Sequence, residues 1–196
     1  MLTCRLLSSQ HCDVKPDNFV LSAPQSSKYE HGDIPLSDLT LVDFGRAIDL
    51  SQYSQDEDED VRNVLISGSA VSKDMQCVAM RTQRPWSYDI DTYGILGSAH
   101  VLLYGTHMEI RKGRDGKWRP NTTLKRYWQQ DLWKEIFETL LNLDELGTAI
   151  GSRSSNLRAL RRKINVYLKS EGVAEKLLSL LKRQAGMLPD SREKIA

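Results

Sequence analysis

Three carboxylate and amide side chains stand in an order that suits phosphoryl transfer. Asp13 and Asn18 lie in the segment 11–18, which reads HCDVKPDN, and Asp43 follows 25 residues after Asn18 (43 minus 18). A carboxylate at position 13 can accept the proton of an attacking hydroxyl, while an amide oxygen and a second carboxylate can hold a metal ion. Lys15 can neutralise the transferring phosphoryl group. The order and spacing predict transfer of a phosphoryl group from a metal-bound nucleotide.

The two segments resemble the catalytic loop and the Asp-Phe-Gly turn of protein kinases. Lys15-Pro16 is the form of the loop that serine/threonine kinases carry. The resemblance implies that Asp13 is the catalytic base and that Lys15 faces the phosphate. It also implies that Asn18 and Asp43 bind Mg²⁺, and that ATP is held by Lys15, Asn18, Asp43 and Val20, with Val20 under the adenine. The supporting residues that it implies are His11 and Phe44, stacked behind the turn, Gly45 within the turn, and Asp91, hydrogen-bonded to the backbone of the catalytic loop.

The segment 76–94, which reads QCVAMRTQRPWSYDIDTYG, is more particular than a generic kinase sequence. It resembles the Bub-type spindle-assembly-checkpoint kinases, with their Q-C-x-x-M, R/K-P-W-x-Y and I-D-x-x-G elements. The match continues through LYGTHM at 103–108, DLW at 131–133 and LRALR at 157–161. The resemblance implies a serine/threonine kinase at mitotic kinetochores, in the nucleus and on chromosomes. A histone tail at centromeres would be among its substrates, and checkpoint proteins would bind through regions outside this chain.

The resemblance also implies a mostly α fold, the C-terminal lobe of a kinase with a few short strands at the cleft. Only ten residues precede His11, and the sequence contains neither G-x-G-x-x-G nor V-A-I-K, so we expect the N-terminal, nucleotide-gripping lobe to be absent from residues 1–196. The expected parts are the catalytic loop 11–18, the metal-binding turn 43–45, an activation segment at about 43–80 and a helical remainder at 86–185.

Hydrophobic periodicity predicts the elements that position these residues. Short apolar runs at 19–21 and 39–42 predict two strands beside the metal-binding residues, joined by a loop at 22–38. A helix is predicted at 89–104 with His100 as a core residue, followed by a loop at 111–127. Further helices are predicted from an Asp131 cap to Leu141, after Ser154-Ser155 through Leu168 with a stop at Gly172, and around 177–181 with an end near Gly186.

Two positions depart from the kinase pattern. Cys12 replaces the arginine that usually precedes the base, so control through a phosphate bound at that arginine is not expected. Ala79 replaces a glutamate that ties down the end of the activation segment, and its absence is expected to loosen that segment. The acidic run at 56–60 is either a solvated loop, a stand-in for an activating phosphate, or a selector of basic substrates.

Composition excludes several other classes of protein. The chain has 196 residues, 40% hydrophobic and 27% charged, with a net charge of +1, which argues against binding to nucleic acid or a membrane surface. Its three cysteines show no C-x-x-C spacing, and no signal peptide or membrane-length apolar run is present, so an intracellular location is expected. Two alternatives stay open: a catalytically silent pseudokinase scaffold, and a kinase-like small-molecule phosphotransferase, which Lys15-Pro16 and the segment 86–94 disfavour.

Overall fold

The computed structural model describes residues 9–21, 39–53, 64–68, 71–143, 150–170 and 172–185. The chain divides into two compact units, Met1–Val20 with Thr40–Leu157, and Leu21–Leu39 with Arg158–Ala196. The predicted site residues all belong to the first unit. The strands are β1 (Ser9–Gln10), β2 (Phe19–Leu21), β3 (Leu39–Leu41), β4 (Ile48–Asp49), β5 (Ile110–Lys112) and β6 (Trp118–Pro120), and the α-helices are α2 (Val78–Arg81), α3 (Asp89–Tyr104), α4 (Gln130–Leu141), α5 (Ile150–Leu168) and α6 (Val173–Ala185).

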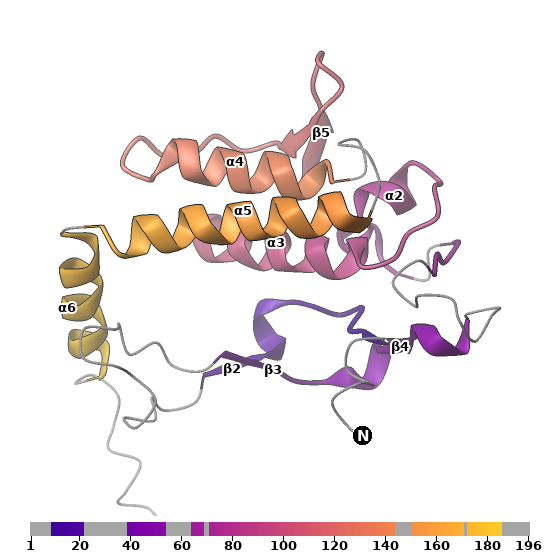
Figure 1. The fold of residues 1–196 in the computed structure, drawn as a ribbon, viewed down its shortest axis with the longest axis horizontal. Helices are drawn as coiled ribbons and strands as arrows, with labels where there is room; N and C mark the ends of the chain where they lie inside the picture. Colours follow the sequence, from indigo (N-terminus) through magenta and orange to yellow (C-terminus); the bar gives the residue numbers. More distant parts are fainter. Residues whose placement is uncertain are drawn as a thin grey trace, which may run out of the picture. The chain divides into compact units, whose positions relative to one another are not determined.

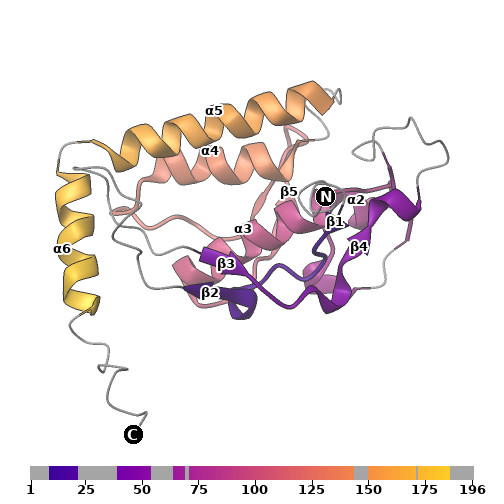
Figure 2. The same ribbon diagram turned by 60° about the horizontal axis from the view of Figure 1, so that its bottom comes forward.

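The mostly α architecture with short strands is confirmed (Figure 1). β2 pairs with β3, so the two predicted apolar runs form one small sheet (Figure 2). A further antiparallel pair, β1 with β4, joins the start of the catalytic loop to the segment after the Asp-Phe-Gly turn. The sequence did not predict this pair because strands of two residues carry no readable alternation.

Helix α3 forms the core of the first unit and matches the predicted helix 89–104. It is apolar on most sides and buries Ile90, Tyr93 and Leu96. His100 is fully buried: its Nδ1 lies 2.8 Å from the carbonyl oxygen of Thr106 and its Nε2 lies 3.0 Å from Oγ1 of Thr122. Burial lowers the pKa of His100 below its ordinary value. The predicted core role of His100 is confirmed.

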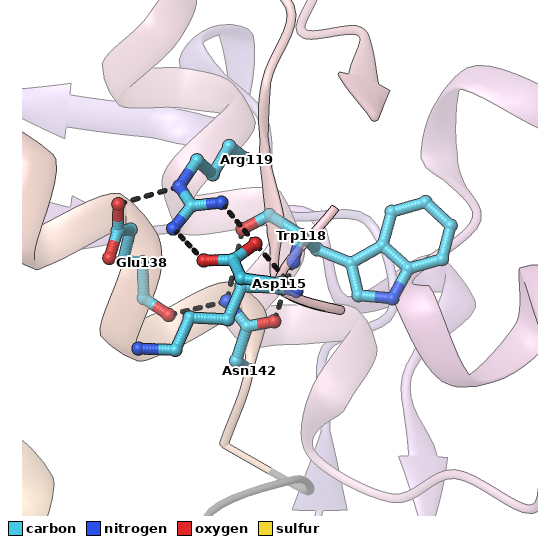
Figure 3. Close-up of polar contacts among 6 residues, drawn as sticks. Asp115, Trp118, Arg119, Glu138 and Asn142 are labelled. Atoms are coloured by element: carbon cyan, nitrogen blue, oxygen red, sulfur yellow. Dashed lines mark hydrogen bonds and ion pairs between the residues drawn. The ribbon is translucent and has the colours of Figure 1, made fainter. Parts of the chain in front are cut away.

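The predicted loop 111–127 is wrong, because it contains most of the hairpin β5–β6. Asn142, at the end of α4, holds this hairpin: its Oδ1 accepts from the Trp118 amide at 2.7 Å, and its Nδ2 donates to the Trp118 carbonyl at 3.0 Å. The Arg119 guanidinium binds both Asp115 oxygens, at 2.6 and 2.8 Å, and Glu138 of α4 at 2.6 Å (Figure 3). Strands rich in Arg and Lys lack the apolar alternation that marks a strand in sequence.

The later helices differ from prediction at their beginnings. Asp131 lies in the first turn of α4 and is not its N-cap, which is Gln129. Helix α5 begins at Ile150, ahead of the predicted Ser154-Ser155, and ends at Leu168, before the predicted stop at Gly172. Helix α6 covers the predicted stripe and ends at Ala185. The predicted loop 22–38 and the acidic run 56–60 lie outside the described residues, and within the described ranges no helix is long and apolar enough to span a bilayer.

Helix α2 closes the segment that follows the Asp-Phe-Gly turn, and hydrogen bonds of the half-buried Arg81 side chain hold it. The Arg81 side chain donates to the carbonyl oxygens of Gln76 at 2.8 Å and Lys73 at 2.9 Å, and to the Tyr93 hydroxyl of α3 at 3.1 Å. Ala79 is buried, with 1% of its surface exposed. Arg81 therefore ties residues 73–81, the end of the segment after the Asp-Phe-Gly turn, to α3. This end of the segment is packed although position 79 carries no carboxylate.

We expect Ala79→Glu to destabilise the protein by about 3 kcal/mol or more, because the new carboxylate would enter a buried site without a partner. The small cavity beside Ala79, about 20 Å³, is bordered by the Asp89 carboxylate, and no cation is among the described residues that line it. Thermal unfolding of Ala79→Glu against the same-shape neutral variant Ala79→Gln checks this. Equal melting temperatures would contradict the buried-charge argument.

Candidate active site

The catalytic-loop residues predicted from the sequence meet around one carboxylate. The Lys15 ammonium lies 2.8 Å from Oδ2 of Asp13. The Asn18 amide donates to the Asp13 backbone carbonyl at 2.8 Å and to Oδ2 at 3.3 Å. Asp13 and Asn18 are both buried, with 5% exposed, and the buried Oδ1 of Asp13 has no hydrogen-bond partner among the residues that the structure describes. One oxygen of this carboxylate therefore keeps its lone pairs free for a further donor.

Asp13 is held in its charged form. Burial alone would raise the pKa of its carboxyl, but the hydrogen bond and charge of Lys15 and the hydrogen bond of Asn18 outweigh burial, so the pKa lies below its ordinary value. The pKa of Lys15 is raised, first by its hydrogen bond to Asp13. A carboxylate with a low pKa is a weak base, but it can still accept a hydrogen bond from a hydroxyl and so orient it.

His11 connects the catalytic loop to the segment before Asp43. Its Nε2 lies 2.9 Å from the Val42 carbonyl oxygen, and its Nδ1 lies 3.3 Å from the Asp13 amide nitrogen. The tautomer with the proton on Nε2 satisfies both contacts. The Val42 amide in turn donates to the Asn18 carbonyl at 2.9 Å. Asn18 and the residue next to Asp43 are therefore hydrogen-bonded neighbours, and His11 braces the junction.

The Asp-Phe-Gly turn contacts His11 through the Phe44 ring, but edge-on and not in the stacked arrangement expected from the sequence. The rings of His11 and Phe44 lie with their centroids 4.7 Å apart in an edge-on arrangement at 63°. The backbone at Asp43 is left-handed, with φ of 64°, and its Oδ1 accepts from the Gly45 amide at 3.3 Å. Asp43 lies exposed beside Lys15, and its charge contributes to the raised pKa of that ammonium. Val20 is 48% exposed, so an apolar surface is open to a ligand after Asn18.

Asp91, at the start of α3, fixes the backbone of the catalytic loop. Its Oδ2 accepts from the His11 amide at 2.8 Å and its Oδ1 accepts from the Cys12 amide at 2.7 Å. These are the hydrogen bonds expected for Asp91 from the sequence. Both amides belong to buried residues, so each needs a protein acceptor. The loop that carries Asp13 is thus anchored to the core helix by one carboxylate.

We expect Asp91→Asn to lower the free energy of unfolding by about 2–3 kcal/mol, because asparagine has one acceptor oxygen for two buried amides. Its NH₂ group would also face one of those amides. Asp131→Asn, an exposed first-turn position of α4, is the control and should change stability by less than about 0.5 kcal/mol. Chemical denaturation of both variants checks this, and similar midpoints would remove Asp91 from its anchoring role.

Cys12 is buried in a strained position between these anchors. Its φ is 60°, in the left-handed region that non-glycine residues seldom adopt, and its Sγ lies 3.7 Å from Oε1 of Gln10. Burial, followed by the charge of Asp91, raises the pKa of its thiol to about 12. A neutral buried thiol offers no charge to an anion, which agrees with the expectation that this position binds no activating phosphate.

Two functional neighbours were not predicted from the sequence. Gly94 of α3 packs against the catalytic loop so closely that a Cβ there would lie 2.5 Å from the Val14 carbonyl oxygen. Arg81 ties the segment after the turn to α3, as described above. Gly94 belongs to the I-D-x-x-G element that carries the family resemblance, but only the packing distance shows why glycine is needed. The position of Arg81 in the sequence did not indicate its contacts with Lys73, Gln76 and Tyr93.

The donor set suits the metal that the kinase resemblance implies. Mg²⁺ prefers hard oxygen ligands and binds proteins through one or two such groups together with substrate phosphates. The Asn18 amide oxygen and the Asp43 carboxylate are groups of this kind, and the Val42–Asn18 hydrogen bond places their backbones at one junction. These two residues would hold Mg²⁺, and the apolar Val20 would lie under the adenine of ATP.

Comparison with known proteins places this geometry in a family, although no protein-family model matches the chain. The chain is 35% identical over 185 residues to the mitotic checkpoint serine/threonine-protein kinase BUB1 of Arabidopsis thaliana, covering 89% of this chain and 33% of that protein. It is 33% identical over 150 residues to the spindle assembly checkpoint serine/threonine-protein kinase bub1 of Schizosaccharomyces pombe, covering 67% of this chain and 13% of that protein. The crystal structure of the BubR1 kinase domain matches with a TM-score of 0.66 and 33% identity, over 89% of this chain.

The chain belongs to the Bub-type kinase family. It spans about half of the BubR1 kinase-domain structure and a third or less of the curated relatives just described. The predicted resemblance to Bub-type kinases and the predicted kinase-like, mostly α fold are therefore confirmed.

Proposed function

We propose that this chain is the catalytic-loop part of a serine/threonine protein kinase that transfers the γ-phosphoryl group of ATP-Mg²⁺ to protein hydroxyls in the spindle assembly checkpoint. The observation that carries the proposal is the bonded cluster of Asp13, Lys15 and Asn18, joined through Val42 to the Asp-Phe-Gly turn. Protein substrates, with a histone tail at centromeres among them, and an action at kinetochores in the nucleus follow from the resemblance to the Bub-type family.

Each residue of the cluster has one task in this reaction. Asp13 orients the substrate hydroxyl and accepts its proton through a carboxylate oxygen, and Lys15 offers its ammonium to the phosphoryl group as charge shifts toward the leaving oxygen. His11 and Asp91 keep the loop backbone in place, which matters because phosphoryl transfer depends mainly on positioning and charge stabilisation. Asn18 and Asp43 would hold Mg²⁺, which would supply neutralising positive charge at the phosphates of ATP.

The extended protein needed for a test is this chain preceded by the N-terminal kinase lobe of the Arabidopsis relative. Calorimetric titration of ATP-Mg²⁺ into this extended protein should show binding that Asp43→Ala weakens at least tenfold, because that carboxylate is a proposed metal ligand. Asp115→Ala, in the remote hairpin, is the control. Equal affinities for the wild type and Asp43→Ala would remove Asp43 from the metal site.

The 196-residue chain by itself should fold but should bind no ATP-Mg²⁺ at micromolar concentrations. Its sequence has no glycine-rich loop to cover the phosphates, and the Val20 side chain that would lie under the adenine is half-exposed. The same calorimetric titration on the chain alone checks this. Micromolar binding there would mean that the described residues suffice to hold the nucleotide.

The second candidate function is a pseudokinase scaffold, in which the lobe binds partners without transferring phosphate. The specific observation that favours it is that Cys12 and Ala79 stand where kinases usually carry an arginine and a glutamate. Both side chains are buried and carry no charge. If the chain is a scaffold, the wild type should transfer no phosphate. Its binding of ATP or of a partner should also be unchanged by Asp13→Asn. The two functions therefore differ in one assay.

A further inference from the structure

The hairpin β5–β6 concentrates positive charge in one short stretch of the first unit. Residues 110–120, which read IRKGRDGKWRP, contain five cationic side chains and one carboxylate, whereas the whole chain has a net charge of +1. Four of the cations, Arg111, Lys112, Arg114 and Lys117, are exposed, and Arg119 is half-buried against α4. The near-neutral composition of the chain therefore conceals a local positive surface.

Asp115, the one carboxylate of residues 110–120, is paired within the hairpin. It binds the Arg119 guanidinium through both of its oxygens, at 2.6 and 2.8 Å, and Glu138 of α4 binds the same guanidinium at 2.6 Å (Figure 3). The turn is shaped around this pair, because a Cβ at Gly113 would lie 2.6 Å from both Arg119 Nη1 and Asp115 Oδ1. The carboxylate of the hairpin is thus committed to the half-buried arginine.

Arg111 faces a like charge across the hairpin. It is the register partner of Arg119, so two cationic residues stand directly opposite each other on one face. Like charges at such positions destabilise a pair of strands. The charge of Arg119 is neutralised as described, but within the described ranges no ion pair reaches Arg111, Arg114 or Lys117. These three exposed cations are open to an anion supplied by another molecule.

The hairpin is fixed to α4, so its cations are presented on a rigid frame. Asn142 bonds to both backbone groups of Trp118, and Arg119 bonds to Glu138. Lys112 Nζ lies over the Trp118 ring, 6.0 Å from its centroid. Figure 1 shows the tip of the hairpin extending beyond α4. A surface that is already ordered loses less conformational freedom when a partner binds.

The charge of α4 limits the class of molecule that fits this surface. A hollow of about 300 Å³ between the hairpin and α4 is lined by Lys117, Asp131, Lys134, Glu135, Glu138, Thr139 and Asn142. Duplex DNA carries a negative charge about every 1.7 Å along its axis, so a duplex over the hairpin would bring phosphates toward the three carboxylates of α4. A single extended protein segment is narrow enough to contact the hairpin alone.

We propose that the hairpin β5–β6 is a docking surface for an acidic segment of a partner protein. The segment lies extended along the hairpin, and its carboxylates pair with Arg111, Arg114 and Lys117. Arginine suits this role because its planar guanidinium binds a carboxylate through two parallel hydrogen bonds. The docking surface uses none of the residues of the catalytic loop, so it goes beyond the proposed function and would serve an active kinase and a scaffold equally.

The test uses the full 196-residue chain with nitrogen-15 in its tryptophan indoles, followed by NMR. Trp118 lies in β6, and its Nε1 has no hydrogen-bond partner among the described residues. Trp86 is buried, donates from its Nε1 to the Gly68 carbonyl at 2.7 Å, and serves as the internal reference. The probe is a peptide in which glutamate alternates with serine. The matched peptide has glutamine in place of each glutamate, and fluorescence anisotropy of the labelled peptides gives their affinities.

The glutamate peptide should shift the Trp118 signal, leave the Trp86 signal unchanged, and bind about tenfold more tightly than the glutamine peptide, the combined effect of a few exposed ion pairs. Addition of salt should weaken its binding, because exposed ion pairs are screened. The glutamine peptide keeps the length and hydrogen-bonding capacity of the probe, so the difference between the two peptides measures the charge alone.

A pair of double variants locates the binding. Arg111→Gln/Arg114→Gln should weaken the glutamate peptide about tenfold. Arg158→Gln/Arg161→Gln removes two exposed arginines from α5, the same change in net charge, and should leave the affinity unchanged. Thermal unfolding controls for loss of fold. The hairpin variant should melt no lower than the wild type, because it removes a like charge from the strand pair.

The proposal is overturned if the glutamine peptide binds as tightly, if the Trp118 signal does not move, or if the two double variants weaken binding equally. A short DNA duplex that binds more tightly than the glutamate peptide at physiological ionic strength, and loses that binding in the hairpin variant, would assign the surface to nucleic acid and overturn it as well. The readout needs neither ATP nor turnover, so the docking surface and the proposed function stand or fall separately.

Discussion

Asp13→Asn in the extended protein is expected to lower the rate of phosphoryl transfer about a thousandfold, within the range that general acid–base groups contribute. The amide keeps the shape of the carboxylate but cannot accept the proton of the hydroxyl, and it turns a donor toward either Lys15 or the substrate. The effect should appear in kcat. ATP affinity should be nearly unchanged, because the proposed ligands of the nucleotide are other residues.

The same substitution should change stability by less than about 1 kcal/mol. The Lys15 side chain is 43% exposed, and ion pairs with an exposed partner contribute little to folding. Steady-state kinetics with thermal unfolding on the same samples checks both effects, and Asp115→Asn is the control for loss of a remote carboxylate. A rate near that of the wild type would remove Asp13 from the role of base.

Gly94→Ala is expected to destabilise the protein by about 2–3 kcal/mol, the cost of overpacking a tight contact. The added Cβ would lie 2.5 Å from the carbonyl oxygen and 2.7 Å from the Cβ of Val14, so α3 or the catalytic loop must move. For a chain of this size the melting temperature should fall by roughly 5–10 °C. Displacement of Val14 should also reduce phosphoryl transfer, because Asp13 precedes it in the loop.

Gly97→Ala is a matched control for this prediction. It lies in the same helix, and, the backbone of that helix aside, its Cβ would meet no atom of the described residues within 4 Å. Replacing an unhindered helical glycine with alanine stabilises by about 0.8–1 kcal/mol, so the two variants should shift the melting temperature in opposite directions. Shifts of the same sign and size would show that helix propensity, and not contact with the catalytic loop, decides the outcome at Gly94.

Much of the site could be predicted from the sequence because its residues lie in two short motifs. Asp13, Lys15 and Asn18 are within six positions of one another, and the apolar runs beside them predicted the β2–β3 pair. Helix α3 was predicted from its apolar length. Each of these features depends on neighbours close in the chain, which is where sequence patterns carry information.

The features that were missed depend on long-range packing. The hairpin β5–β6 consists of charged three-residue strands held by Asn142 and Arg119, and no local alternation marks it. The role of Arg81 depends on contacts with Lys73 and Tyr93, which only the fold brings together. The start of α5 was placed late because Ile150 and Gly151 carry no cap signal.

Transfer of radiolabel from ATP to a protein substrate tests directly whether Asp13 serves phosphoryl transfer. With Mg²⁺ present, the extended protein should place label on serine or threonine of a histone tail, and Asp13→Asn should leave almost none. Hydrolysis of the labelled substrate to its phosphoamino acids identifies the acceptor. An extended protein that is folded and binds ATP, yet transfers no label above the Asp13→Asn background, would contradict the kinase assignment and favour the scaffold.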